Sequence, residues 1–205
     1  MGKLLKYAFS ITHIDNIPHI LKFGLLLADS SMRDEKFVSI GDPQVINIRK
    51  MLMVGGKNLR DYVPFYLGPR TPMLYVIQHG YNGVRRQDPA GIVYCVLRLA
   101  DLIRDKVDCF FTDGHALSAL TKIYEKDRLP EICQIINYDD VYVSQWNNDS
   151  DIDLKRRKEA ELLIKGDVPP DYIRGYIVYN DDAKEKLKSF GIAEELIVVA
   201  PNYYF

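Results

Sequence analysis

Apolar residues in this chain come in short runs, and this pattern restricts the fold more than any other feature. Runs such as IVYCVL at 92–97 are rich in β-branched and aromatic residues and lie between glycine, proline or charged residues. Such runs are typical of short buried strands. A run of about 18 apolar residues, which a membrane-spanning helix needs, does not occur. Strands are predicted at 6–12, 73–77, 92–97, 107–113, 162–164, 171–180 and 195–205.

Short helices are predicted between these strands. Apolar residues recur at helical spacing from Ile17 to Leu21, and Gly24 is suited to end that helix. Strands outnumber helices, and neither an internal repeat nor a linker divides the sequence. The prediction is therefore one α+β domain over residues 1–205. Further helices are predicted at 98–106, 116–126 and 181–191.

Composition and charge describe an ordinary globular protein with no strong preference for a polyanion. The hydrophobic fraction is 47%, the charged fraction is 27% and the formal net charge is -1. A nucleic acid would therefore have to bind through local basic patches, because the protein as a whole is not basic. The N-terminal sequence has no signal-peptide pattern, so the expected compartment is the cytoplasm.

The cysteines and histidines favour neither disulfides nor a metal site. Cys95, Cys109 and Cys133 are odd in number, widely spaced and set among apolar residues, as expected for reduced core residues. The four histidines lack metal-ligand spacing, so no metal is expected.

The segment 154–164, LKRRKEAELLI, joins a dense run of charge to an apolar run. If a strand begins at Leu162, Glu161 lies at its mouth, where a rigid scaffold can hold the carboxylate over a cleft. The alternative is a solvated helix in which Glu159 and Glu161 only balance the basic residues.

Two further segments are candidates for binding. Residues 27–61 show little periodicity, so we expect a lid over a site, with Arg49 aimed into that site. The glycines in GGK at 55–57 lack the rest of a phosphate-binding loop, and that interpretation is discarded. The aromatic stretch 61–80 could stack on a base or could simply belong to the core.

Four segments together resemble the DarT family of DNA ADP-ribosyltransferase toxins. They are ITHIDNIPHILKFGLL at 11–26, DYVPFYLGPRTPMLY at 61–75, TDGHA at 112–116 and KRRKEAELLI at 155–164, in this order. The resemblance covers essentially the whole chain. It implies an ADP-ribosyltransferase fold, a split β-sandwich that binds NAD in the cleft between two sheets.

The resemblance also implies roles for particular residues. Glu161 becomes the catalytic glutamate and Arg49 a functional arginine that balances the diphosphate and helps to position the acceptor base. The residues implied in NAD binding are His13, Ile14, Asp15, Lys22, Ser30 and Arg49.

A single-stranded DNA substrate follows from the same resemblance. Residues 115–161 would recognise it, His115 would orient a base or phosphate, and the basic run would bind phosphates through Lys155, Arg156 and Arg157. Tyr142 and Trp146 are candidates for stacking on unpaired bases. The sequence departs from the family where Lys155 and Arg156 replace an arginine followed by an acidic residue.

Several alternatives remain open at this stage. The expected acceptor is thymine, and the alternatives are guanine, RNA, protein or simple hydrolysis of NAD. A different class is a non-catalytic module that binds NAD or single-stranded DNA. The expected partner is a macrodomain antitoxin that removes the modification, and the expected oligomeric state is a monomer.

Overall fold

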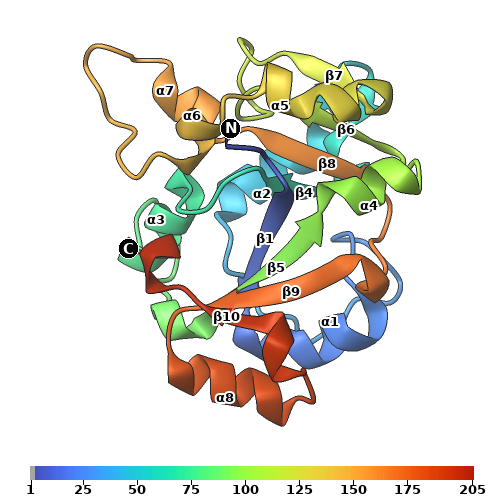
Figure 1. The fold of residues 1–205 in the computed structure, drawn as a ribbon, viewed down its shortest axis with the longest axis vertical. Coiled ribbons are helices and arrows are strands. Elements are labelled where there is room, and N and C mark those ends of the chain that lie inside the picture. Colours follow the sequence, from blue (N-terminus) through green and yellow to red (C-terminus); the bar gives the residue numbers. More distant parts are fainter. Residues whose placement is uncertain (1–2) are drawn as a thin grey trace.

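One mixed sheet of eight strands organises the protein, which we describe from a computed structural model over residues 3–205 (Figure 1). The strand order is β10-β9-β5-β1-β4-β8-β6-β7, with only the β9–β10 pair parallel. The strands are β1 Tyr7–His13, β4 Tyr62–Tyr66, β5 Ile92–Arg98, β6 Cys109–Thr112, β7 Ile123–Glu125, β8 Glu161–Lys165, β9 Ile173–Val178 and β10 Ile197–Val199, and β2 Met53–Val54 with β3 Lys57–Asn58 forms a separate hairpin.

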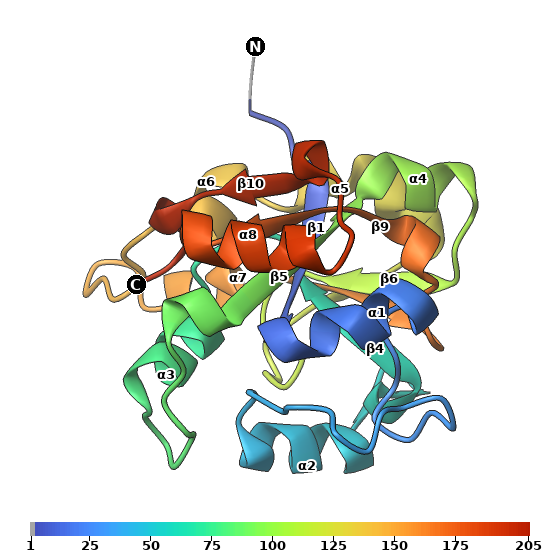
Figure 2. The same cartoon turned by 90° about the horizontal axis from the view of Figure 1, so that it is seen from below.

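Short helices cover the sheet and its edges (Figures 1 and 2). In Figure 2, α2 and the chain that leads to it lie below α1 and beside β4, away from the other helices. The helices are α1 Ile17–Phe23, α2 Pro43–Met51, α3 Pro72–His79, α4 Leu99–Arg104, α5 Ile132–Ile135, α6 Tyr138–Tyr142, α7 Leu154–Lys158 and α8 Asp181–Ser189.

The sheet divides between its two central strands. β1 pairs with β5 along its whole length, and β4 pairs with β8 along its whole length, but β1 and β4 pair only at Phe9 and Tyr66. The two halves are therefore β10-β9-β5-β1 and β4-β8-β6-β7. Since the strands separate beyond this one pair, a cleft can open between the halves.

Each face of the β1–β5 half has its own hydrophobic core. Ala8 faces the larger core, to which α1 contributes Ile17 and α8 contributes Leu187. Phe9 points to the opposite face and packs in the core that contains Leu74 of α3. This alternation of successive side chains is that of a strand buried on both faces.

The strand predicted at 73–77 is wrong, because these residues form α3. Thr71 caps the helix by accepting a hydrogen bond from the Leu74 amide, Pro72 occupies its first turn, and Gly80 ends it in the left-handed conformation with φ 72°. A short apolar run has no period that separates a strand from a helix, so the capping residues decide.

The helix predicted at 116–126 is also wrong. Turns lead into β7 at Ile123–Glu125, which pairs with β6 through Phe110, Phe111 and Thr112. Pairing at the sheet edge outweighs the weak helical pattern of this segment.

Residues 27–61 are more regular than the sequence predicts. Asp42 accepts hydrogen bonds from Gln44 and Val45 and so caps α2, with Pro43 in the first turn. Helix α2 carries Arg49, and the β2–β3 hairpin follows it. An aspartate followed by proline is a recognisable sequence signal for the start of a helix.

Other predictions agree with the structure. The remaining predicted strands up to β9, the helix that ends at Gly24, α4 and α8 are present. The strand predicted at 195–205 is present only as β10 at 197–199, because Pro201 begins a turn of 3-10 helix at 201–203. Cys95 and Cys109 are buried and free, whereas Cys133 is free but exposed, so the prediction of a core position for Cys133 is wrong.

Candidate active site

Glu161 is the first residue of β8 and forms an ion pair with Arg49 of α2. Arg49 Nη2 donates to Glu161 Oε2 at 2.6 Å, and Nη1 donates to Oε1 at 3.3 Å. The Glu161 side chain is 1% exposed and that of Arg49 14% exposed. The expectation of a carboxylate at the mouth of a strand is thereby confirmed in geometry, and the solvated-helix alternative is wrong because Glu161 is buried in the sheet.

Burial and the ion pair act in opposite directions on the carboxyl group. Burial alone would raise the pKa of Glu161, but the charge and hydrogen bonds of Arg49 hold it below its ordinary value. Arg49 has a raised pKa for the corresponding reason, because Glu161 outweighs its burial. Tyr66 lies opposite Glu161 in the β4–β8 register, and burial followed by the Glu161 charge raises its pKa well above the ordinary value. The carboxylate is therefore ionised at neutral pH.

The loop at 113–122 completes the surroundings of the carboxylate. The Ala116 amide donates to Glu161 Oε1 at 3.0 Å, and His115 Nε2 lies 3.9 Å from the same oxygen. Burial lowers the pKa of His115, so its imidazole is neutral at neutral pH. Thr112 ties the loop to β8 by accepting a hydrogen bond from the Glu161 amide at 3.2 Å.

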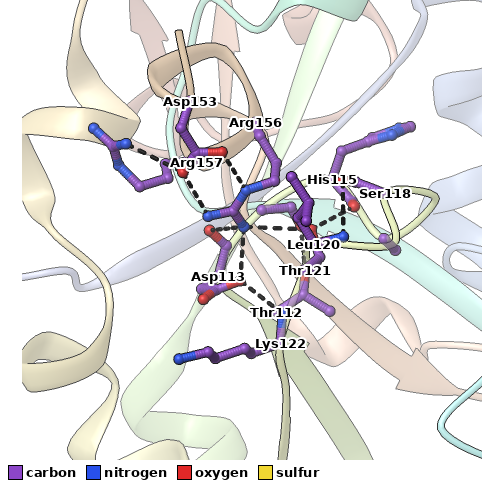
Figure 3. Close-up of polar contacts among 12 residues, drawn as sticks. Thr112, Asp113, His115, Ser118, Leu120, Thr121, Lys122, Asp153, Arg156 and Arg157 are labelled. Carbon is purple, nitrogen blue, oxygen red and sulfur yellow. Dashed lines mark hydrogen bonds and ion pairs between the residues drawn. The ribbon is translucent and has the colours of Figure 1, made fainter. Parts of the chain in front are cut away.

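Arg156 of α7 holds this loop in place (Figure 3). Its Nη1 donates to Asp113 Oδ1 at 2.8 Å, and its Nε donates to Asp153 Oδ1 at 2.7 Å. The backbone carbonyl of Arg156 accepts a hydrogen bond from the His115 amide at 3.1 Å. A Cβ at Gly114 would overlap the Arg156 guanidinium, so the close approach depends on glycine. Arg156 thus joins α7 to the loop that carries His115.

In the basic run at 155–157, the two arginines form ion pairs with aspartates and the lysine, within the described part of the chain, does not. Arg157 forms ion pairs with Asp140, Asp151 and Asp153 at 2.7, 2.7 and 3.2 Å. Arg156 is paired as described above, so the donors of both arginines face protein carboxylates. Lys155 is exposed and forms no ion pair within residues 3–205. Of the three residues predicted to bind phosphates, Lys155 is the one whose charge is free.

A cavity of about 490 Å³ opens where β1 and β4 diverge. Its walls come from β1, from β4, from α2 with Arg49, and from the chain between α1 and α2. We call this cavity the cleft. The segment predicted to be a lid therefore lines it. The apolar lining residues are Ile11, Leu26, Leu27, Phe37, Val38, Ile40, Ile46, Leu59, Val63 and Pro64.

The cleft also has cationic groups suited to a diphosphate. Arg33, Arg49, Lys50 and Arg60 line it. Arg60 pairs with Asp29, whereas the Arg33 guanidinium lies 4.1 Å from the ring centroid of Phe37 and donates to the Leu27 carbonyl. Apolar walls with several guanidinium and ammonium groups fit a dinucleotide, whose rings need burial and whose phosphates need donors.

Two partly buried polar contacts hold the segment between α1 and α2, which was predicted to be a lid, against the rest of the protein. The Asn16 side chain exchanges two hydrogen bonds with the Val38 backbone, at 2.9 and 2.8 Å. Asp167 accepts hydrogen bonds from the Leu27 amide and from Ser30 Oγ, at 2.7 and 2.8 Å. Ser30, one of the predicted nucleotide contacts, is thus held by a carboxylate.

Of the other predicted NAD contacts, His13, Ile14 and Asp15 lie at the end of β1, and Lys22 lies on α1. His13 accepts a hydrogen bond from the Asp15 amide, and burial lowers the pKa of its imidazole. Asp15 pairs with Lys186 at 2.7 Å, Ile14 is buried in the core, and Lys22 is exposed with its ammonium over the Phe23 ring. Arg49 is the predicted contact that lines the cleft itself.

The sequence did not predict the backbone amide that contacts Glu161 or the side chains that hold the surrounding loops in place. The Ala116 amide, Thr112 and Asp113 surround Glu161 or its loop, and Asn16 and Asp167 anchor the lid. The TDGHA motif at 112–116 pointed to the loop without indicating which atoms contact Glu161.

Neither a metal centre nor a membrane span emerges from the described chain. Residues 3–205 contain no group of three or more histidine, cysteine, aspartate or glutamate side chains that could hold a metal ion. No helix among them has the length and apolar character needed to cross a bilayer.

Comparisons with known proteins agree with the fold. A family model described as ssDNA thymidine ADP-ribosyltransferase, DarT, matches residues 9–205. A DNA ADP-ribosyl transferase of Escherichia coli O127:H6 is 34% identical over 184 residues, covering 88% of this chain and 83% of the relative. The structure of Thermus sp. 2.9 DarT in complex with ADP-ribosylated ssDNA has a TM-score of 0.83 at 26% identity, with both chains covered in full.

A relative from Thermosipho africanus is a fusion of a DNA ADP-ribosyl transferase with a DNA ADP-ribosyl glycohydrolase. It is 30% identical over 199 residues, and this chain spans about half (48%) of its length. Together with the split sheet, these matches define an ADP-ribosyltransferase that acts on DNA, and they confirm the predicted fold class. The chain belongs to the DarT family.

Proposed function

We propose that this protein transfers ADP-ribose from NAD to a thymine base in single-stranded DNA, releases nicotinamide and acts as a toxin. The observation that carries the proposal is the buried Arg49–Glu161 pair, since Arg49 lines the cleft and holds the carboxylate beside it. Thermus DarT has been solved in complex with NAD+ and with ADP-ribosylated ssDNA. The family description names thymidine.

Glu161 is proposed to stabilise the positive charge that develops on the ribose. The bond between the ribose anomeric carbon and nicotinamide breaks, and nicotinamide leaves with the electron pair. An ionised carboxylate that is already oriented by Arg49 and Ala116 stabilises this cationic centre without reorganising. The lowered pKa of Glu161 keeps the carboxylate in the charged form that this role needs.

The acceptor nitrogen of thymine then forms a bond to the anomeric carbon and loses its proton. We propose Glu161 as the group that receives the proton, with Arg49 stabilising the negative charge that develops on the base as the proton leaves. The nitrogen becomes far more acidic as it bonds to the cationic carbon, so a weak carboxylate base is sufficient. Neutral His115 is proposed to orient the base beside Glu161.

Contacts to NAD are proposed for the cleft and its rim. His13, Ile14, Asp15, Lys22, Ser30 and Arg49 are the residues to which this role is assigned. Arg33 adds a cation that lines the cleft. Lys155 is proposed to bind a DNA phosphate, while Arg156 and Arg157 organise the protein surface around it.

The Arg156 assignment gives a prediction with a matched control. Arg156→Lys keeps the charge but loses the forked contacts to Asp113 and Asp153, so kcat should fall about 10- to 100-fold with little change in the KM for DNA. Arg128→Lys is the control, because Arg128 pairs with Glu131 on the surface and not with Asp153 or with the loop at 113–122. A rise in KM with unchanged kcat would instead indicate a phosphate contact.

The toxin role implies an enzyme that reverses the modification. The Thermosipho relative joins a transferase and a glycohydrolase in one chain. We propose a separate or linked partner of that kind, a macrodomain antitoxin, for this protein, and we place the reaction in the cytoplasm with a monomeric enzyme.

The acceptor base is tested with single strands that each lack one of the four bases. The purified protein is incubated with NAD and each strand, and the DNA products are weighed. A gain of one ADP-ribose that is absent only from the thymine-free strand is the expected result. Dependence on guanine would retain the class and change the acceptor. No gain on any DNA would reject the proposal and favour RNA, protein or a binding module.

A further inference from the structure

A second cavity, which we call the aromatic pocket, has about 520 Å³ and shares no lining residue with the cleft. Four aromatic and two cationic side chains line this pocket. The aromatic residues are Tyr75, Tyr81, Trp146 and Phe205, and the cationic residues are Arg70 and Lys155.

The aromatic rings of this pocket hold one another in fixed orientations. Tyr75 of α3, Trp146 between α6 and α7, and Phe205 meet edge to face, with ring centroids 5.1 to 5.9 Å apart. Tyr81 stacks on His79, with centroids 5.5 Å apart and planes 8° apart, and is 49% exposed. Rigid rings around a hollow are suited to a flat aromatic ligand.

Arg70 lines the pocket with a guanidinium that no acceptor of the described residues engages. Its backbone adopts the left-handed conformation, with φ 51°, and its amide donates to the Tyr94 hydroxyl at 3.2 Å. The guanidinium lies 4.4 Å from the ring centroid of Phe205. Its Nε is buried and has no hydrogen-bond partner. The guanidinium forms no hydrogen bond or ion pair within residues 3–205, so those of its nitrogens that remain accessible in the pocket can donate to an acceptor of a ligand.

We propose that the aromatic pocket binds a nucleobase adjacent to the modified base in the same DNA strand, with Arg70 and Lys155 binding its phosphates. This inference rests on the proposed function. A base supplies a flat ring for stacking, and its phosphate supplies the acceptor and negative charge that the two cations require. Asn82, Gln145 and Asn147 line the same pocket and can hydrogen-bond to the edge of a base.

The pocket lies within reach of the reacting carbon. Arg70 follows Tyr66 by four residues, so their Cα atoms are at most ~14 Å apart, and Tyr66 lies opposite Glu161 in the sheet. Lys155 is close enough to His115 for its charge to lower the pKa of that imidazole. One short single strand can therefore occupy both places.

The test uses Trp146, which is the only tryptophan of the 205 residues. A short single strand with one target thymine is titrated into the protein without NAD, and the quenching of tryptophan fluorescence is recorded. The same strand is then prepared with one nucleotide at a time replaced by an abasic residue. We expect one flanking abasic position to remove the quenching and to weaken binding about 10- to 100-fold.

Protein variants distinguish binding of a base in the aromatic pocket from binding of DNA elsewhere on the protein. Tyr81→Ala should weaken binding about 10-fold for the intact strand and much less for the strand with that abasic position. Tyr7→Ala is the control, since Tyr7 is a comparably exposed tyrosine (40%) that lines a different cavity. Lys155→Ala should lower the salt dependence of binding.

The outcomes distinguish this inference from the proposed function. DNA that is modified without quenching Trp146, or a Tyr7→Ala variant that loses as much affinity as Tyr81→Ala, would overturn the aromatic pocket as a base site. Quenching that depends on one flanking base, on DNA that is never modified, would retain the pocket and reject the transfer reaction.

Discussion

Glu161→Gln should lower the rate of ADP-ribose transfer to DNA by about 10³-fold or more while leaving the fold intact. The substitution keeps the shape of the side chain and removes the negative charge that is proposed to face the ribose and to receive the proton. With its amide oxygen at the Oε1 position, glutamine can still accept hydrogen bonds from Arg49 Nη1 and the Ala116 amide, whereas the contact of Arg49 Nη2 at Oε2 is lost. Single-turnover transfer to a thymine-containing strand measures the rate, and circular dichroism checks the fold.

Glu125→Gln is the matched control for that experiment. Glu125 lies on β7, is exposed on the surface and pairs with Lys57 rather than with Arg49. Its substitution should leave transfer nearly unchanged. If Glu161→Gln retained more than about a tenth of the rate, its expected contribution as a catalytic carboxylate would be refuted.

Arg49→Ala should abolish transfer and also lower the free energy of unfolding by about 3–5 kcal/mol near neutral pH. The substitution leaves the Glu161 carboxylate buried without its counter-charge, which is the costly way to break a buried ion pair. Urea unfolding of the purified variant measures the stability. The double variant Arg49→Ala with Glu161→Gln should recover part of the loss, because it removes the stranded charge.

The pH dependence of the Arg49→Ala variant should have the opposite sign to that of the native protein. In the native protein the pKa of Glu161 is lowered, so the pair contributes stability above the unfolded pKa, and this is lost as the pH falls through the folded value. Without Arg49, burial raises the pKa above its unfolded value, so stability should increase as the pH falls towards 5. A double variant no more stable than Arg49→Ala would contradict the stranded-charge explanation.

Strands with a clear composition could be predicted from the sequence. IVYCVL at 92–97 and the CFF of 109–111 are β-branched and aromatic, and they form β5 and β6. MLYVI at 73–77 has a similar composition and forms α3 instead, because Thr71 caps it. Residue preferences are similar for both outcomes, so local capping decided the structure.

The site was predictable in its residue types more than in its contacts. The resemblance indicated Arg49 and Glu161, but 112 residues separate them, and no sequence pattern reveals a bidentate pair over that distance. The Ala116 amide was invisible because every residue except proline has such a group. The basic run predicted three phosphate contacts, whereas the carboxylates that engage Arg156 and Arg157 come from 113, 140, 151 and 153.

The division of the sheet has a consequence for how the protein folds. The chain places β1 in one half, β4 in the other, β5 in the first, β6 to β8 in the second, and β9 and β10 in the first again. Neither half is a continuous piece of sequence, so neither can form before distant segments meet. We propose that residues 1–205 are one cooperative folding unit. The residues that line the cleft lie between 11 and 64, whereas Glu161 comes much later in the chain, so a chain that stops before β8 would lack the carboxylate that pairs with Arg49.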